Sequence, residues 1–300
     1  MELENKKFSE YLKEKFGERI HKISLDANLS CPNFKNPCIY CNNSSFSYAK
    51  NLNKVSLKTI EEQFFLARDF VKKRFLAKKF IIYFQTNTNT FAPLDKLKSL
   101  YDIVKISSDI VGLSIATRPD AIDEKKLDLI NSYAENYEVW IEYGLQSAND
   151  KTLDFIQRGH KYIDFCNAVK LTQKLTPKVK IGVHIIVGLP DETEKDIFDT
   201  IDKLNFLKID GIKIHPLHIV KGTKLEKIYL DQLKNDDNSK KINFNFLKFE
   251  KYIEILVKIF ARLNKNIIIL GYSSYCPKNI LVSPEWVSIR DKVILAIKNY

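Results

Sequence analysis

The sequence predicts an α/β fold, an open partial (β/α)6 TIM-like barrel with a C-terminal helical extension. Short apolar runs rich in Ile, Val or Tyr alternate along the chain with stretches of helical periodicity. Each of six such runs is followed by a predicted helix, an order typical of βα units around a parallel sheet. A closed barrel needs about eight units in about 250 residues, whereas these 300 residues offer six units and a tail.

The six predicted strands are compact apolar runs. They span Arg19–Ser24, Phe80–Thr86, Ile110–Ala116, Tyr137–Gly144, Val179–Val187 and Gly211–His218. Helical spacing predicts one helix that begins at an N-cap Ser56 and others over Pro93–Ile106, Asp123–Tyr133, Tyr162–Leu175, Glu192–Leu207, Phe246–Leu263 and Leu281–Lys298. These elements divide the chain into an N-terminal segment (1–17), a core barrel (18–230) and a C-terminal extension (231–300).

Composition and charge exclude several classes of protein. The chain has no run of 18 apolar residues, and its charged start lacks the apolar core of a secretory signal. We therefore expect a cytoplasmic protein with no membrane partner. The net charge of +11 and the pI of about 9.2 favour a polyanionic partner such as nucleic acid. Because Lys, Asn and Ile are abundant throughout, a compositional bias explains the charge equally well.

Three of the five cysteines lie within eleven residues, directly after the first predicted strand. Cys31, Cys38 and Cys41 form a C-x6-C-x2-C pattern, and no fourth Cys or His lies in this loop. Three thiolates can hold three irons of a [4Fe–4S] cluster and leave the fourth iron open to another ligand. The alternative is a zinc site completed by a distant ligand. Cys166 is predicted to pack as a small apolar residue, and Cys276 is a candidate for contact with substrate or cluster.

Further motifs follow in a fixed order: Tyr83–Pro93, Gly112–Asp120, Val139–Ala148, Arg158–His160, Val187–Pro190 and Gly211–His218. Together with the cysteine loop, this set resembles the radical S-adenosylmethionine (SAM) superfamily. Within it, the set is similar to the YtqA/YhcC-type (MnmL-like) proteins, which are related to the Elongator-type branch. The resemblance covers about residues 18–230. Two departures are a shorter cysteine loop without a Gly-rich insert, and residues 271–278, which replace a Thr-Gly-Asp-Ala-Pro-Arg-like segment.

The resemblance implies two cofactors, a [4Fe–4S] cluster on Cys31, Cys38 and Cys41, and SAM on the open iron. Arg158 follows Gln146 by twelve residues, and the resemblance implies that its guanidinium pairs with the SAM carboxylate. The expected SAM-binding residues are Tyr40, Gln85, Asn87, Glu142, Gln146, Arg158, His184, Ile186 and Gly188.

Several of these residues have a second interpretation besides SAM binding. Glu142 either faces the barrel interior, with SAM or Lys213 as its partner, or faces outward. His184 either contacts the ribose or is a core histidine whose hydrogen bonds are satisfied. Arg158 either pairs with the SAM carboxylate or is a surface residue at a helix end. Lys213 and His215 share one face of the last strand by alternation. If that face is inward, they line the substrate end of the barrel and are the candidate catalytic residues.

The resemblance also implies a function, the trimming of 5-carboxymethylaminomethyl to 5-aminomethyl on the wobble uridine of tRNA, followed by a tRNA methyltransferase. We hypothesise that a 5′-deoxyadenosyl radical attacks the glycine methylene, and that one-electron oxidation and hydrolysis release glyoxylate. An electron donor such as flavodoxin or ferredoxin is expected. Phosphates would meet a basic rim that includes residues 72–74, 78–79 and 240–241. The alternatives are a radical SAM enzyme with a small-molecule substrate such as a tetrapyrrole, and a non-enzymatic zinc-stabilised nucleic-acid-binding module.

Overall fold

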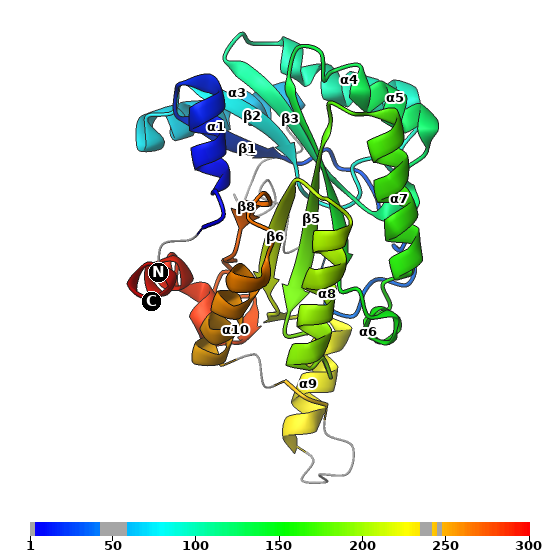
Figure 1. Ribbon diagram of the computed structural model, residues 1–300, viewed down its shortest axis with the longest axis vertical. Helices are drawn as coiled ribbons and strands as arrows, with labels where there is room; N and C mark the ends of the chain where they lie inside the picture. Colours follow the sequence, from blue (N-terminus) through cyan, green and yellow to red (C-terminus); the bar gives the residue numbers. More distant parts are fainter. Residues whose placement is uncertain (1–3, 43–58, 235–241, 245–247) are drawn as a thin grey trace.

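The computed structural model describes residues 4–42, 59–234, 242–244 and 248–300, and it confirms an α/β fold around a curved parallel sheet (Figure 1). Within these residues the sheet has seven strands in the order β1-β2-β3-β4-β5-β6-β8, and every neighbouring pair is parallel. They are β1 (Ile20–Leu25), β2 (Lys79–Phe84), β3 (Ile110–Thr117), β4 (Glu138–Gln146), β5 (Lys180–Val187), β6 (Gly211–Pro216) and β8 (Ile268–Gly271). The first six correspond to the six predicted strands.

The C-terminal extension is less helical than predicted. It supplies β8, and it also supplies β9 (Leu281–Ser283), which pairs antiparallel with β7 (Ile219–Val220). The helix predicted over Leu281–Lys298 is therefore wrong in its first part, because β9 and a 3-10 turn precede α11 (Lys292–Asn299). Pro284 is the physical reason, since proline lacks an amide donor and disfavours helical geometry in the residue before it.

Most helices lie on the outer face of the sheet (Figure 1). The remaining helices of the described chain are α1 (Phe8–Phe16), α3 (Ile60–Phe75), α4 (Leu94–Tyr101), η1 (Asp102–Lys105), η2 (Pro119–Ala121), α5 (Glu124–Asn131), α6 (Asp150–Phe155), α7 (Tyr162–Leu175), α8 (Glu194–Phe206), α9 (Lys224–Lys234), α10 (Phe249–Arg262) and η5 (Glu285–Ser288). Among the described residues, no helix combines the length and the apolar character that a bilayer crossing requires. Ser56 lies outside these residues, and α3 instead begins after the N-cap Thr59, which forms a capping box with Glu62.

Side chains that alternate along the strands fill the barrel interior in layers. At the amino ends of the strands the layer is apolar, and Ile81 and Trp140 cluster there with Phe8 and Leu12 of α1. The next layer is polar, and we call it the interior polar layer. It consists of Lys22, Tyr83, Ser114, Glu142 and Lys213. Beyond this layer, the carboxyl ends of the strands surround the site described below.

Candidate functional site

A cavity of about 630 Å³ opens at the carboxyl ends of the strands. In open α/β sheets, this edge is where ligands bind. Ten of the predicted site residues line the cavity: Cys31, Cys38, Tyr40, Cys41, Gln85, Asn87, Glu142, Gln146, Arg158 and His184. Four others are not among its lining residues: Ile186, Gly188, Lys213 and His215. The fold therefore gathers most of the predicted site from segments that are far apart in sequence.

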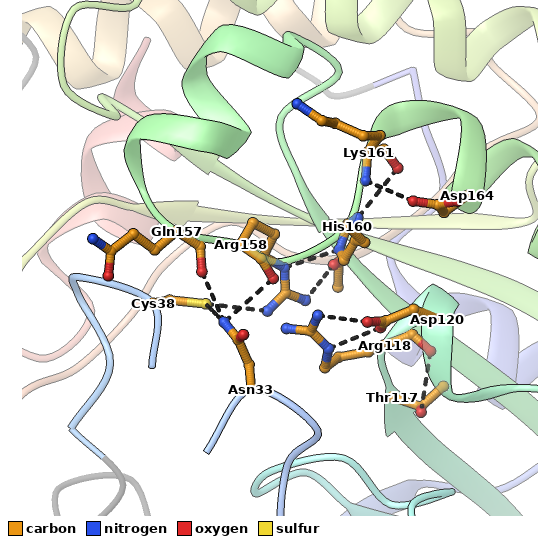
Figure 2. A network of polar contacts seen from close by, with 11 residues as sticks. Asn33, Cys38, Thr117, Arg118, Asp120, Gln157, Arg158, His160, Lys161 and Asp164 are labelled. Carbon is orange, nitrogen blue, oxygen red and sulfur yellow. Dashed lines mark hydrogen bonds and ion pairs between the residues drawn. The ribbon is translucent and has the colours of Figure 1, made fainter. Parts of the chain in front are cut away.

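The cysteine loop lies against the turn that follows α6 (Figure 2). The Ile39 amide donates to the Ile156 carbonyl at 3.0 Å, and Asn33 Nδ2 donates to the Gln157 carbonyl at 2.7 Å. Asn33 Nδ2 also lies 3.7 Å from Cys38 Sγ. These bonds fix the path of the loop, and they hold Cys38 buried in the cavity wall.

The three thiols lie close enough for their charges to interact. Burial raises the pKa of the Cys38 thiol, but the cations Arg158 and Arg118 outweigh it and hold that pKa below its ordinary value. Burial, followed by the charges of Cys38 and Cys31, raises the pKa of the Cys41 thiol to about 12. Binding of a cationic cluster displaces the thiol protons, and three cysteine thiolates are a donor set for an iron–sulfur cluster with one open iron. The side chains present therefore fit such a cluster.

Arg158 is 7% exposed, which excludes the surface alternative for this residue. Its Nε donates to His160 Nε2 at 3.0 Å and its Nη1 to Cys38 Sγ at 3.6 Å (Figure 2). Its Nη2 donates to the Gly144 carbonyl at 2.5 Å. Burial and the charge of Arg158 lower the pKa of His160 to about 4, so the neutral ring accepts this bond. A guanidinium has about five N–H donors. Two donors of Arg158 therefore remain for the carboxylate of a ligand.

Arg118 places a second guanidinium in the same wall. Its Nε and Nη2 donate to the carboxylate of Asp120 at 2.8 and 2.7 Å (Figure 2). Its Nη1 is buried and has no hydrogen-bond partner among the described residues. Since buried donors are nearly always satisfied, this N–H is suited to a bound anion. The sequence predictions miss this role, and the available signal was the Thr-Arg-Pro-Asp turn that follows β3.

Gly144 leaves room for Arg158. A Cβ at this position would lie 2.7 Å from Arg158 Nη2 and 2.8 Å from Gln146 Nε2. We expect Gly144→Ala to displace both side-chain ends and to weaken SAM binding about tenfold or more, since a hydrogen bond to a charged group contributes about 1.5–3 kcal/mol. Calorimetric titration of SAM into the cluster-containing protein measures this effect. Gly271→Ala is the matched control, because its Cβ would meet only Lys213 at 3.6 Å; equal losses in both variants would contradict the argument.

Glu142 faces the interior and is fully buried, so its outward alternative is wrong. Its carboxylate accepts hydrogen bonds from Lys22 Nζ at 2.5 Å, His184 Nε2 at 2.6 Å and Tyr83 OH at 3.1 Å, and also from Ser114. Burial raises the pKa of Glu142, but the charge of Lys22 and the contact with His184 hold it well below its ordinary value. The carboxylate is thus satisfied by protein groups, and its cation is Lys22, which the sequence predictions do not include.

Lys213 and His215 both face the interior, next to the lining residue His184. Lys213 Nζ donates to Tyr83 OH at 3.2 Å, and burial lowers the pKa of Lys213 to about 8. The rings of His215 and His184 are 5.3 Å apart, and His215 Nδ1 lies 2.9 Å from Ser274 Oγ. Burial and the charge of Lys213 lower the pKa of His215 well below its ordinary value, so its ring is neutral near pH 7. The two candidate catalytic side chains are therefore close to the cavity but not in its wall.

The three predicted residues of β5 and its turn have different surroundings. His184 lines the cavity while its Nε2 is bonded to Glu142, so it is both satisfied and accessible to a ligand. Ile186 packs against the same buried apolar cluster as Tyr40. Gly188 follows the strand with a φ of 96°, a conformation that glycine adopts readily. Of the three, His184 is the one among the residues that line the cavity.

The predicted basic rim is not part of this cavity wall in the described residues. Lys72 pairs with Asp109 at 2.8 Å, and residues 78–79 lie at the start of β2, the end remote from the cavity. Residues 240–241 lie outside the described part of the chain. The cations that do line the cavity are Arg118, Arg158 and Arg290.

Comparison with known proteins finds several similar sequences. Over 291 residues the chain is 38% identical to an uncharacterized protein of Methanocaldococcus jannaschii, covering 95% of this chain and 85% of that protein. Over 295 residues it is 31% identical to YhcC of Escherichia coli K12, covering 96% of this chain and 89% of that protein. A stretch of 123 residues is 32% identical to the tRNA uridine(34) acetyltransferase of M. jannaschii, covering 40% of this chain and 22% of that protein.

The fold is shared with a solved archaeal Elp3 of Methanocaldococcus infernus that lacks its N-terminus. The TM-score is 0.65 at 16% identity, and the match covers 93% of this chain and 63% of that chain. The family model of the radical SAM superfamily matches residues 30–204, and that of the Radical_SAM C-terminal domain matches residues 209–299. The chain therefore belongs to the radical SAM superfamily and is an enzyme whose cofactors are a [4Fe–4S] cluster and SAM.

Proposed function

We propose that this enzyme acts on tRNA and converts the 5-carboxymethylaminomethyl group of the wobble uridine to 5-aminomethyl. The observation that carries the proposal is Lys213, a partly buried cation next to the cofactor cavity, which can pair with a substituent that ends in a carboxylate. The partial identity to a tRNA uridine(34) acetyltransferase supports a tRNA substrate. The net charge of +11 favours a polyanionic partner in general.

The cavity wall is assigned to the cofactors. We assign Cys31, Cys38 and Cys41 as the cluster ligands, and the two remaining donors of Arg158 to the SAM carboxylate. The other assigned SAM contacts in the wall are Tyr40, Gln85, Asn87, Gln146 and His184. When bound, the cluster and SAM supply a 5′-deoxyadenosyl radical that takes a hydrogen atom from the substrate.

Lys213 of the interior polar layer and the nearby His215 are assigned to the substrate. Protonated Lys213 pairs with the carboxylate of the uridine substituent, and neutral His215, held by Ser274, offers a hydrogen bond beside it. The carboxymethyl group leaves as glyoxylate. The substrate radical gives one electron to an acceptor of the iron–sulfur class and becomes an imine. Water then hydrolyses the imine: its oxygen becomes the aldehyde oxygen, the C–N bond breaks and one proton is released to solvent.

Lys213→Ala is expected to lower uridine processing about 30-fold or more, since loss of one partner of a buried charge pair costs about 2–5 kcal/mol. SAM cleavage should fall less, so more 5′-deoxyadenosine forms for each product. Because burial lowers the pKa of Lys213 to about 8, the wild-type kcat/KM should fall as the pH rises through 8 and the cation is lost. The variant should lack this alkaline decline. Lys195→Ala, at an exposed site on α8, is the control for loss of a lysine. A Lys213→Ala variant with the same alkaline decline as the wild type would contradict the assignment.

The deciding assay incubates the cluster-containing enzyme and SAM with tRNA that carries 5-carboxymethylaminomethyluridine, using reduced flavodoxin or ferredoxin as the electron donor. Mass spectrometry of the digested tRNA should show loss of this nucleoside and gain of 5-aminomethyluridine. In cells that lack the protein, the substrate nucleoside should accumulate, and the downstream tRNA methyltransferase should lose its substrate. Competent SAM cleavage without any change in the nucleoside would contradict the proposal and favour a small-molecule substrate.

A further inference from the structure

Part of the C-terminal extension belongs to the cavity wall. Tyr275, Pro277 and Arg290 line the same cavity as the three cysteines of the loop. They come from residues 271–278, the segment that departs from the family pattern, and from the turn before α11. No step assigned above uses them. These two segments therefore bring an aromatic ring and a cation to the cofactor cavity.

Tyr275 and Arg290 form a stacked pair. The guanidinium carbon of Arg290 lies 4.0 Å from the centre of the Tyr275 ring. Tyr275 is nevertheless 45% exposed. Among the described residues no carboxylate forms an ion pair with Arg290, in contrast to Arg262, which pairs with Asp202 at 2.6 Å. The pair thus combines an accessible ring with a cation that has no carboxylate partner in the described part of the chain.

The protein holds this pair in a defined place. The Cys276 amide donates to the Val287 carbonyl at 3.2 Å, and this bond ties the two segments together. The neighbouring Trp286 stacks on Tyr252 of α10, with ring centres 5.2 Å apart. Ser274, next to Tyr275, contacts His215 at 2.9 Å. The ring and the cation are therefore anchored both to the core and, through Ser274, to His215 of β6.

We propose that Tyr275 and Arg290 form a nucleotide clamp, in which Tyr275 stacks against a base of single-stranded RNA and Arg290 contacts its phosphate. Aromatic rings and arginine planes are the groups that recognise unstacked bases in RNA loops. The inference rests on the proposed function, because a wobble uridine must leave the anticodon stack to reach a buried radical. The clamp holds a neighbouring nucleotide of the opened loop while the modified substituent extends toward Lys213.

The test measures binding of a labelled anticodon stem-loop RNA to the cluster-containing protein in the presence of SAM. Tyr275→Ala should weaken binding roughly 5- to 150-fold, the range for loss of one base–aromatic stack. Tyr275→Phe should retain binding. Arg290→Ala should also weaken binding and should lower the slope of log K against log salt by about one, whereas Tyr275→Ala should leave the slope unchanged.

Matched controls separate the clamp from general effects. Tyr300→Ala removes an exposed tyrosine that does not line the cavity, and Arg262→Ala removes a surface cation of the same extension. A duplex RNA without a loop should bind the wild type and Tyr275→Ala equally. Wild-type protein that binds no stem-loop at low salt would contradict both the tRNA function and the clamp. Stem-loop binding that is unchanged in Tyr275→Ala and Arg290→Ala would contradict the clamp alone.

Discussion

Replacing Cys31, Cys38 or Cys41 with Ala is expected to abolish SAM cleavage. Each thiolate holds one iron of the cube, and two thiolates cannot fix the cluster while leaving one defined iron open. At Cys38 the structure adds a second reason, because its sulfur lies 3.6 Å from Nη1 of Arg158, the cation assigned to the SAM carboxylate. Iron and sulfide content per chain, measured together with 5′-deoxyadenosine formation, would report the loss.

Two other cysteines provide controls within the same chain. Cys166 is buried on α7, and Cys276 is buried in the C-terminal segment; neither lines the cavity. Burial raises the pKa of Cys276 to about 11, so it is a protonated thiol near pH 7. Their Ala variants should therefore keep the cluster. A variant with all three loop cysteines replaced that still bound about four irons per chain would contradict the assignment.

Most of the sheet is predictable because each buried parallel strand leaves a continuous apolar run in the sequence. The seventh strand, β8, is only four residues long, and it lies between the two predicted helices of the extension, in a stretch to which the sequence predictions assign no element. Its pairing with β6 depends on a contact between distant segments. Local periodicity carries no information about such a contact, which explains why the sequence does not predict this strand.

The candidate site is likewise predictable only in part. The cysteines and Arg158 are found because fixed spacings mark them, and the structure brings them together. The direction of Glu142 cannot be settled by counting, because the β4–β5 register shifts between Gly144 and Gln146, and a shift breaks simple alternation. Lys22 and Arg290 are absent from the predictions, since a single Lys or Arg becomes part of a site only through tertiary contacts.

Arg158→Ala is expected to lower the affinity for SAM about 30-fold to several-thousand-fold, because loss of one partner of a desolvated ion pair costs about 2–5 kcal/mol. The cluster should remain, since all three thiolates are present. Arg158→Lys should recover only part of the affinity. A lysine cannot bond both carboxylate oxygens in a fork, and it cannot also keep the bonds to Gly144, His160 and Cys38. Titration of SAM into the reconstituted protein, followed by the cluster's visible absorbance, measures the change.

Arg262→Ala is the control for loss of a positive charge, because this guanidinium pairs with Asp202 at the surface and does not line the cavity. Its SAM affinity should equal that of the wild type. If Arg158→Ala also bound SAM like the wild type, the carboxylate would have to be held by another buried cation. Arg118 is the side chain with an unsatisfied N–H in the same wall. Retained binding in the double variant of Arg158 and Arg118 would then exclude both guanidinium groups as the carboxylate site.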